Sequence, residues 1–300
     1  MVQPWQSQLG NQRDWVWRGW QVRYTFIRAT NLAETAHTPP ILFLHGFASA
    51  LTQWQENLIP LSQSHTIYAL DLVGFGASEK AAANYKVGFW VEQVYDFWRM
   101  FIGQPIVLVG HSLGALVALT ATVTHPEMVQ RLGLVTLPAA RQELLSGWFL
   151  SLAGEMESLF SSPWLIRPLF YVIRQPWTIR AILRGIYINK ERVTDALVES
   201  FLAPGRDRGA IQALIRLTKA RTQNDFSLKT KEMLPQVQVP ILLLWGLDDR
   251  VIPLTWGRQL PPLNPNLKLV EIPDAGHCPY DECAECVNAE ILAWIMATDR

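Results

Sequence analysis

Six short runs of apolar residues constrain the fold of this chain most strongly. They lie at residues 41–45, 66–72, 105–110, 132–137, 240–246 and 267–273. Runs that are apolar throughout are typical of strands buried on both faces. Candidate helices lie between them, at residues 51–63, 88–102, 113–125, 255–262 and 283–297. This alternation predicts an α/β fold with a mainly parallel, doubly wound sheet.

Two regions depart from this alternation. Residues 15–29 alternate apolar and polar positions around Gly19, which predicts an antiparallel hairpin at the sheet edge. Residues 139–232 lose the strand pattern and have a helical composition broken by prolines. We therefore expect a core formed by residues 1–138 and 233–300, with residues 139–232 as a helical insertion.

The composition restricts the partners and the compartment. The 26 basic and 26 acidic residues give no net charge, so no overall field favours nucleic acid. Three cysteines in a chain of 300 residues favour a reducing compartment. The first twenty residues lack the pattern of a secretory signal, and no apolar run reaches the about 18 residues of a membrane-spanning helix. We expect a cytoplasmic protein.

The most specific motif is "VLVGHSLGA", in which Gly110, Ser112 and Gly114 form G-x-S-x-G between a predicted strand and a predicted helix. A serine at such a nucleophile elbow sits on a strained turn with its hydroxyl exposed at the carboxyl edge of the sheet. A solvated serine in a tight turn is the alternative. The strand and helix on either side favour a catalytic nucleophile.

A serine nucleophile needs a base, because its hydroxyl is not ionised at neutral pH. In this kind of fold the acid and then the histidine follow the serine along the chain. Asp248 and Asp249 follow one predicted strand, and His277 follows the last. Loops at the carboxyl ends of strands are where such sheets place their sites. One of the two aspartates is expected to orient His277 as general base, while the other could cap a helix.

The reaction also needs an oxyanion hole built from two main-chain N–H groups. One is expected from Leu113, the residue after the nucleophile, and the other from Phe47 in the loop after the first apolar run. His45 is expected to hold this loop, and His111 to pack or form a hydrogen bond locally.

These residues together resemble the α/β-hydrolase superfamily. The matching landmarks are "HGF" at 45–47, "DLVGFGASEK" at 71–80, "GHSLG" at 110–114, "WGLDDRVIP" at 245–253 and "AGHCP" at 275–279. The resemblance implies that Asp249, three residues after Gly246, is the triad acid. It also implies that residues 139–232 are a cap inserted between the sixth and seventh strands. Serine at the elbow argues against the related epoxide hydrolases and haloalkane dehalogenases, which use aspartate.

The segment "AGHCPYDECAECVNAEILAWI" is similar to the C-terminal part of pheophytinases and related chlorophyll-dephytylating hydrolases. This resemblance implies a bulky apolar ester as substrate, such as the phytyl ester of a chlorin, and no cofactor. It also implies a second location, at the periphery of photosynthetic membranes. A carbon–carbon bond hydrolase with the same triad and a non-catalytic ligand-binding protein remain as alternatives.

The predicted cap offers a direct indication of the substrate. Residues 139–232 contain 14 Lys and Arg against 9 Asp and Glu. Its aromatic residues include Trp148, Phe149, Phe160, Trp164, Phe170, Tyr171, Trp177, Tyr187 and Phe201. Such a composition suits a lid over an apolar ligand or peripheral contact with an anionic membrane. Burial of an aromatic helix face against the sheet, which amphipathic helices require whatever the substrate, is the favoured alternative.

All three cysteines, Cys278, Cys283 and Cys286, lie beside His277. Their spacing matches part of an iron–sulfur motif but lacks the fourth cysteine. A zinc site completed by His277 would compete with the triad for that histidine. We therefore expect no metal at this segment.

Overall fold

The computed structural model describes residues 9–30, 38–144 and 163–297. Within these residues one eight-stranded sheet has the strand order β1-β2-β4-β3-β5-β6-β7-β8. The strands are β1 (Asn11–Trp17), β2 (Trp20–Ile27), β3 (Ile41–Leu44), β4 (Ile67–Leu70), β5 (Ile106–His111), β6 (Val129–Val135), β7 (Ile241–Gly246) and β8 (Leu267–Ile272). Neighbouring strands from β4 to β8 are parallel, whereas β1 and β2 run antiparallel at one edge. Both the parallel sheet and the edge hairpin are confirmed.

The strands are apolar throughout because the sheet is covered on both faces. In β3, Ile41 and Phe43 belong to one buried cluster, and Leu42 and Leu44 belong to the other. This alternation is the two-residue period of a pleated strand. The apolar runs predicted strands that are buried on both faces, and β3 shows this burial.

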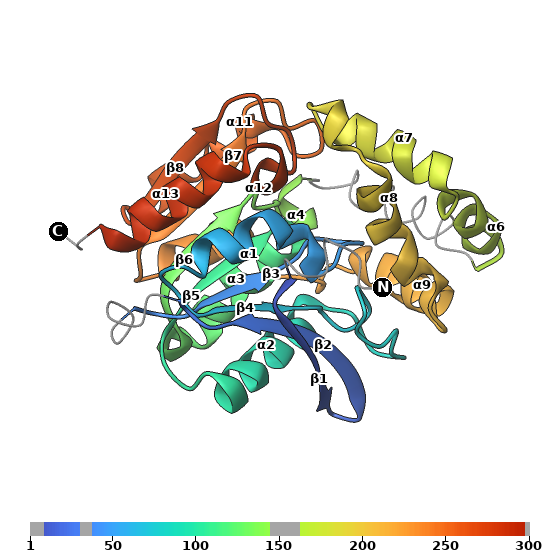
Figure 1. Cartoon of the computed structure of the whole chain (residues 1–300), viewed down its shortest axis with the longest axis horizontal. Coiled ribbons are helices and arrows are strands. Elements are labelled where there is room, and N and C mark those ends of the chain that lie inside the picture. Colours follow the sequence, from blue (N-terminus) through green and yellow to red (C-terminus); the bar gives the residue numbers. More distant parts are fainter. Residues whose placement is uncertain (1–8, 31–37, 145–162, 298–300) are drawn as a thin grey trace.

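Helices pack on each side of this sheet (Figure 1). The helices outside the β6–β7 connection are η3 (Leu51–Trp54), α1 (Gln55–Leu61), α2 (Val87–Phe101), α3 (Leu113–Thr124), η4 (Pro126–Met128), α11 (Leu254–Gly257), η8 (Pro261–Leu263), α12 (Pro279–Glu282) and α13 (Ala284–Met296). Helices α2 and α3 contribute to one buried cluster, and α1 and α13 to the other. The predicted helix at 255–262 is wrong: it is split into α11 and η8, because Pro261 and Pro262 cannot donate the hydrogen bonds of a continuing helix.

The described part of the connection between β6 and β7 is helical. It comprises α4 (Arg141–Leu144), α6 (Pro163–Ile173), α7 (Pro176–Ile186), η5 (Lys190–Arg192), α8 (Asp195–Leu202), η6 (Ala203–Arg206), α9 (Ala210–Arg221), α10 (Thr230–Met233) and η7 (Leu234–Gln236). Helices α6 to α9 gather at one end of the molecule (Figure 1). The boundaries 139–232 stay a prediction, and Trp148, Phe149, Phe160 and the side chain of Trp164 lie outside the described residues.

Ion pairs tie these helices to the rest of the protein. Lys80, whose side chain is 4% exposed, contacts Asp207 between η6 and α9 at 2.8 Å. Lys86 at the start of α2 pairs with Asp225 beyond α9.

Among the described residues, no helix combines the length and the hydropathy that crossing a bilayer requires.

Candidate active site

Ser112 occupies the single position between β5 and α3. Its backbone has a φ of 51° and a ψ of −115°. A non-glycine residue rarely adopts a positive φ, and such strain gathers at functional sites. The main-chain N–H of Ser112 donates to the carbonyl of Val135 on the neighbouring strand at 2.9 Å, which holds the turn in place. The strained strand-to-helix turn that the motif predicted is present.

The two glycines of the motif allow backbones to approach closely. A Cβ on Gly110 would lie 2.2 Å from the main-chain oxygen of Gly114. A Cβ on Gly114 would lie 2.4 Å from the main-chain oxygen of Leu44, at the end of β3. Any side chain at either position would therefore push α3 away from the strands that carry the candidate site.

Asp249 and His277 form a buried pair. The His277 Nδ1–H donates to Asp249 Oδ2 at 2.9 Å, and each residue is 8% exposed. The other carboxylate oxygen, Oδ1, accepts the N–H groups of Val251 and Ile252 at 2.7 and 2.8 Å. Asp248 is exposed instead. The geometry thus pairs His277 with Asp249 and leaves the Nε2 atom of His277 as the nitrogen available to a nucleophile.

His111 connects the elbow to the His277 loop. Its Nε2–H donates to the main-chain oxygen of His277 at 2.9 Å, and the two rings are 4.8 Å apart. The ring therefore packs as expected, but its hydrogen bond is not local, because its partner lies 166 residues further along the chain. Burial, reinforced by the neighbouring His277, lowers the pKa of His111 well below its ordinary value. The His277 loop is thus held directly against the residue that precedes Ser112.

Glu282 holds the other side of the same loop. Its Oε1 atom accepts the N–H of Gly276 at 2.8 Å. Its Oε2 atom accepts the N–H groups of Ile188 and Asn189, beyond α7, at 2.6 and 3.1 Å. A single buried carboxylate therefore links the residue before His277 to the helices of the β6–β7 connection.

Asp281 forms a second link of the same kind. It accepts the hydroxyl of Tyr187 at 2.7 Å, and burial raises its pKa. The residues "HCPYDE" belong to the segment that carries the family resemblance. The sequence alone gave no indication that the two acidic residues of this segment would contact the C-terminal end of α7.

The expected oxyanion-hole residues are the first residue of α3, Leu113, and a residue of the loop after β3, Phe47. Within the described part of the chain, the main-chain N–H groups of Leu113 and Phe47 donate to no other residue. Two such donors are the requirement for stabilising a developing oxyanion. Phe47 is fixed through its ring, which lies 5.5 Å from that of Phe75 and under the guanidinium of Arg221 at 4.8 Å.

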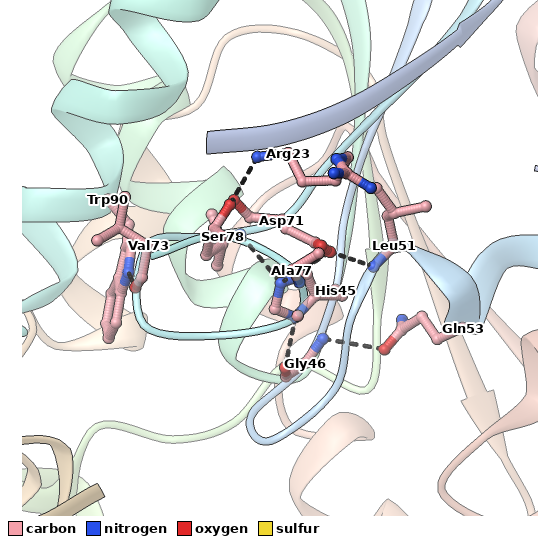
Figure 2. A network of polar contacts seen from close by, with 12 residues as sticks. Arg23, His45, Gly46, Leu51, Gln53, Asp71, Val73, Ala77, Ser78 and Trp90 are labelled. Carbon is pink, nitrogen blue, oxygen red and sulfur yellow. Dashed lines mark hydrogen bonds and ion pairs between the residues drawn. The ribbon is translucent and has the colours of Figure 1, made fainter. Parts of the chain in front are cut away.

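A polar network around His45 and Gly46, the two residues before Phe47, fixes the path of this loop (Figure 2). His45 accepts the N–H of Leu72 on Nε2 at 3.0 Å and donates from Nδ1 to the carbonyl of Gly46 at 2.7 Å. Gln53 accepts the N–H of Gly46 at 3.0 Å. Burial lowers the pKa of His45 to about 4, so the ring stays neutral near neutral pH. His45 therefore has the loop-holding role that the sequence predicted.

Asp71 is a site residue that sequence reasoning missed. Its two carboxylate oxygens accept the N–H groups of Leu51 and Ala77 at 2.6 and 2.7 Å (Figure 2). Burial raises its pKa to about 6. Asp71 thus joins the loop of Phe47 to the loop after β4. Its place in the "DLVGFGASEK" landmark was the available signal.

A pocket adjoins this loop on the side of α8. It is lined by Ser49, Thr52, Gln53, Gln55, Tyr187, Ala196, Leu197, Ser200, Phe201, Tyr280 and Asp281. The lining combines residues of α8, of the segment after Phe47 and of α12. None of the candidate catalytic residues lines it, but the ring of Tyr280 in its lining lies 4.8 Å from that of His111.

The three cysteines are free thiols in different surroundings. Cys278 is buried and its pKa is raised to about 12, whereas Cys286 is exposed. The described residues contain no group of three or more His, Cys, Asp or Glu side chains arranged to hold a metal ion. His277 is engaged by Asp249.

Comparison with known proteins shows the family. A family model described as alpha/beta hydrolase family matches residues 41–289. The chloroplastic pheophytinase of Arabidopsis thaliana is 26% identical over 87% of this chain. This chain spans only 62% of that relative's length. The uncharacterized hydrolase YugF of Bacillus subtilis (strain 168) is 25% identical, and the match covers 85% of this chain and 89% of YugF.

A solved structure has the same fold. The meta-cleavage product hydrolase CumD of Pseudomonas fluorescens IP01 superposes with a TM-score of 0.76. The match is 18% identical and covers 96% of this chain and 98% of that one. The expected fold class and the resemblance are both confirmed. Because the family model spans most of the chain, from β3 into α13, this protein belongs to the alpha/beta hydrolase family.

Proposed function

We propose that the protein is a serine hydrolase that cleaves a carboxylic ester, with Ser112 as nucleophile. The observation that carries this proposal is the buried pair of His277 and Asp249, whose loop is bonded to the residue before a strained Ser112. Such a pair fixes the tautomer of the histidine so that Nε2 accepts a proton. The arrangement follows the order serine, acid, histidine along the chain.

The proposed reaction has two halves. The Oγ of Ser112 attacks the ester carbonyl while Nε2 of His277 takes its proton. The N–H groups of Phe47 and Leu113 stabilise the negative oxygen of the tetrahedral intermediate. His277 then donates its proton to the departing alcohol, leaving an acyl group on Ser112. A water molecule, deprotonated by His277, attacks the acyl-enzyme and releases the acid.

Asp249 keeps its charge throughout this cycle and stabilises the imidazolium form of His277. Its second oxygen is saturated by two main-chain N–H groups, so the carboxylate cannot turn away from the ring. The stabilisation acts on a charged intermediate and therefore lowers the barrier.

We propose a bulky apolar ester, such as a phytyl or chlorin-type ester, as the substrate. The pheophytinase relative and the aromatic residues of the β6–β7 connection support this class. Among those aromatic residues, Tyr187 and Phe201 line the pocket beside the loop of Phe47. We regard helices α6 to α9 as a cap over the site. The location that we propose for the protein is the cytoplasm, or the surface of photosynthetic membranes, where such a substrate would be found.

The proposal is tested by turnover of a p-nitrophenyl ester by Ser112→Ala. We expect kcat to fall by about 10⁵- to 10⁶-fold, because the nucleophile is lost. Ser64→Ala, at a serine remote from the site, serves as the matched control and should retain the wild-type rate. Undiminished turnover in Ser112→Ala would refute the assignment.

A carbon–carbon bond hydrolase is the alternative, because the same residues serve that reaction. Parallel assays with a pheophytin and with a vinylogous diketone from aromatic ring cleavage distinguish the two. A non-catalytic ligand-binding protein would turn over neither compound.

A further inference from the structure

Helices α6 and α7 present an unusual number of apolar side chains to solvent. Twelve large hydrophobic residues are exposed in the described part of the chain, and five of them lie on these two helices. They are Leu169, Tyr171, Val172, Trp177 and Ile182. We call this set, together with Arg174 and Arg184, the α6–α7 surface.

The inward face of α7 does not account for this exposure. Leu183 is 2% exposed, and Ile179 and Ile186 pack against the same buried cluster, so α7 already has an apolar stripe directed at the protein. Trp177 is 66% exposed on the remaining surface of the helix. The outward apolar residues are therefore additional to those that folding requires.

The charge of this segment has one sign. Residues 163–190 contain five Arg and Lys and no Asp or Glu, and one of the five, Arg180, pairs with Asp195 of α8. Arg174 lies over the ring of Tyr171 at 4.4 Å, so a cation and an exposed aromatic ring form one unit. Arg184 is also exposed on α7, seven residues after Trp177 and so on the same face of the helix. Basic side chains interleaved with exposed Trp and Tyr are typical of helices that lie in a membrane interface.

We propose that the α6–α7 surface docks on an anionic lipid bilayer, with α7 lying in the interface plane. A second copy of the chain is a poor occupant, because a symmetric contact would bring identical basic surfaces together. A lipid surface of negative charge complements the basic residues and accepts the apolar ones. This inference concerns a surface distinct from the candidate active site and does not depend on the ester chemistry.

Hydrogen bonds connect this surface to the core. The main chain immediately after α7 is bonded to Glu282, and Tyr187 is bonded to Asp281. A bilayer that binds α7 would therefore hold the His277 loop at a fixed distance and orientation. This geometry would keep the site beside the source of an apolar substrate.

Co-sedimentation of the full chain with vesicles tests the proposal. We expect binding to phosphatidylcholine vesicles with about one third phosphatidylglycerol, and much weaker binding to phosphatidylcholine alone. Two double variants, Trp177→Ser/Ile182→Ser and Arg174→Gln/Arg184→Gln, should each weaken binding by about tenfold or more. Thermal unfolding of each variant checks that the fold is intact.

The matched control is Val16→Ser/Met100→Ser, which removes two exposed apolar side chains elsewhere. This variant should bind anionic vesicles as the wild type does. Failure of the wild type to bind anionic vesicles would overturn the proposal. Equal loss of binding in the control, or full binding by both α6–α7 double variants, would overturn it as well.

Discussion

Replacing Glu282 by glutamine should loosen both the His277 loop and the segment after α7. The carboxylate is 7% exposed and accepts three main-chain N–H groups, those of Gly276, Ile188 and Asn189. Glutamine keeps one acceptor oxygen, and its NH₂ group cannot accept from an N–H. At least one of the three donors then loses its acceptor, and Gly276 is buried.

The number of hydrogen bonds lost sets the expected change in the free energy of unfolding. A buried donor without an acceptor costs about 1–3 kcal/mol, and the surviving hydrogen bonds lose the assistance of a charge. We therefore expect Glu282→Gln to lower the free energy of unfolding by about 2–4 kcal/mol, measured by urea denaturation. Because Gly276 precedes His277, kcat for a p-nitrophenyl ester should fall as well.

Glu285→Gln is the matched control for this prediction. Glu285 is exposed in α13, three residues after Glu282, so its loss of charge should change the free energy of unfolding by less than about 0.5 kcal/mol. If Glu282→Gln were as stable and as active as Glu285→Gln, the three hydrogen bonds would not have the role assigned to them.

Three further outcomes are expected. Asp249→Asn should lower kcat by about 10⁴-fold, because the amide no longer fixes the tautomer of His277, whereas Asp248→Asn should act like the wild type in the same ester assay. Gly114→Ala should lower the free energy of unfolding by about 3 kcal/mol or more in urea denaturation, since its Cβ would overlap the main chain at the end of β3; wild-type stability would contradict this. The pKa of His111 is lowered in the folded protein, so just below pH 6.5 this histidine binds a proton only in the unfolded chain. Proton binding favours the unfolded chain, and the free energy of unfolding therefore falls as the pH falls. The stability of His111→Asn should therefore decline less steeply between pH 7 and pH 5, by up to about 1.4 kcal/mol per pH unit, and parallel curves for variant and wild type would contradict the assignment.

The strand pattern and the elbow could be predicted from the sequence because both are local. An uninterrupted apolar run predicts that β3 is buried on both faces. Two nearby glycines predict the turn at Ser112. The hairpin at 15–29 shows a two-residue alternation that sequence alone reveals. Each of these features depends on neighbours within a few residues.

The supporting contacts could not be predicted because they join distant segments. His111 bonds to a carbonyl 166 residues away, and Glu282 bonds to Ile188 across 94 residues. Asp71 stands in a recognised landmark of the sequence, but only the fold directs two main-chain N–H groups to its carboxylate. Composition indicated a basic, aromatic insertion, but the exposure of Trp177 depends on which face of α7 packs inward.

Covalent labelling of Ser112 tests the central claim most directly. A fluorophosphonate reacts only with a serine that a neighbouring base activates. Intact-mass measurement should show one adduct per wild-type chain, and peptide mapping should place it on Ser112. Ser112→Ala should remain unlabelled under the same conditions. A wild-type chain that gains no adduct, or an adduct that persists in Ser112→Ala, would contradict the account.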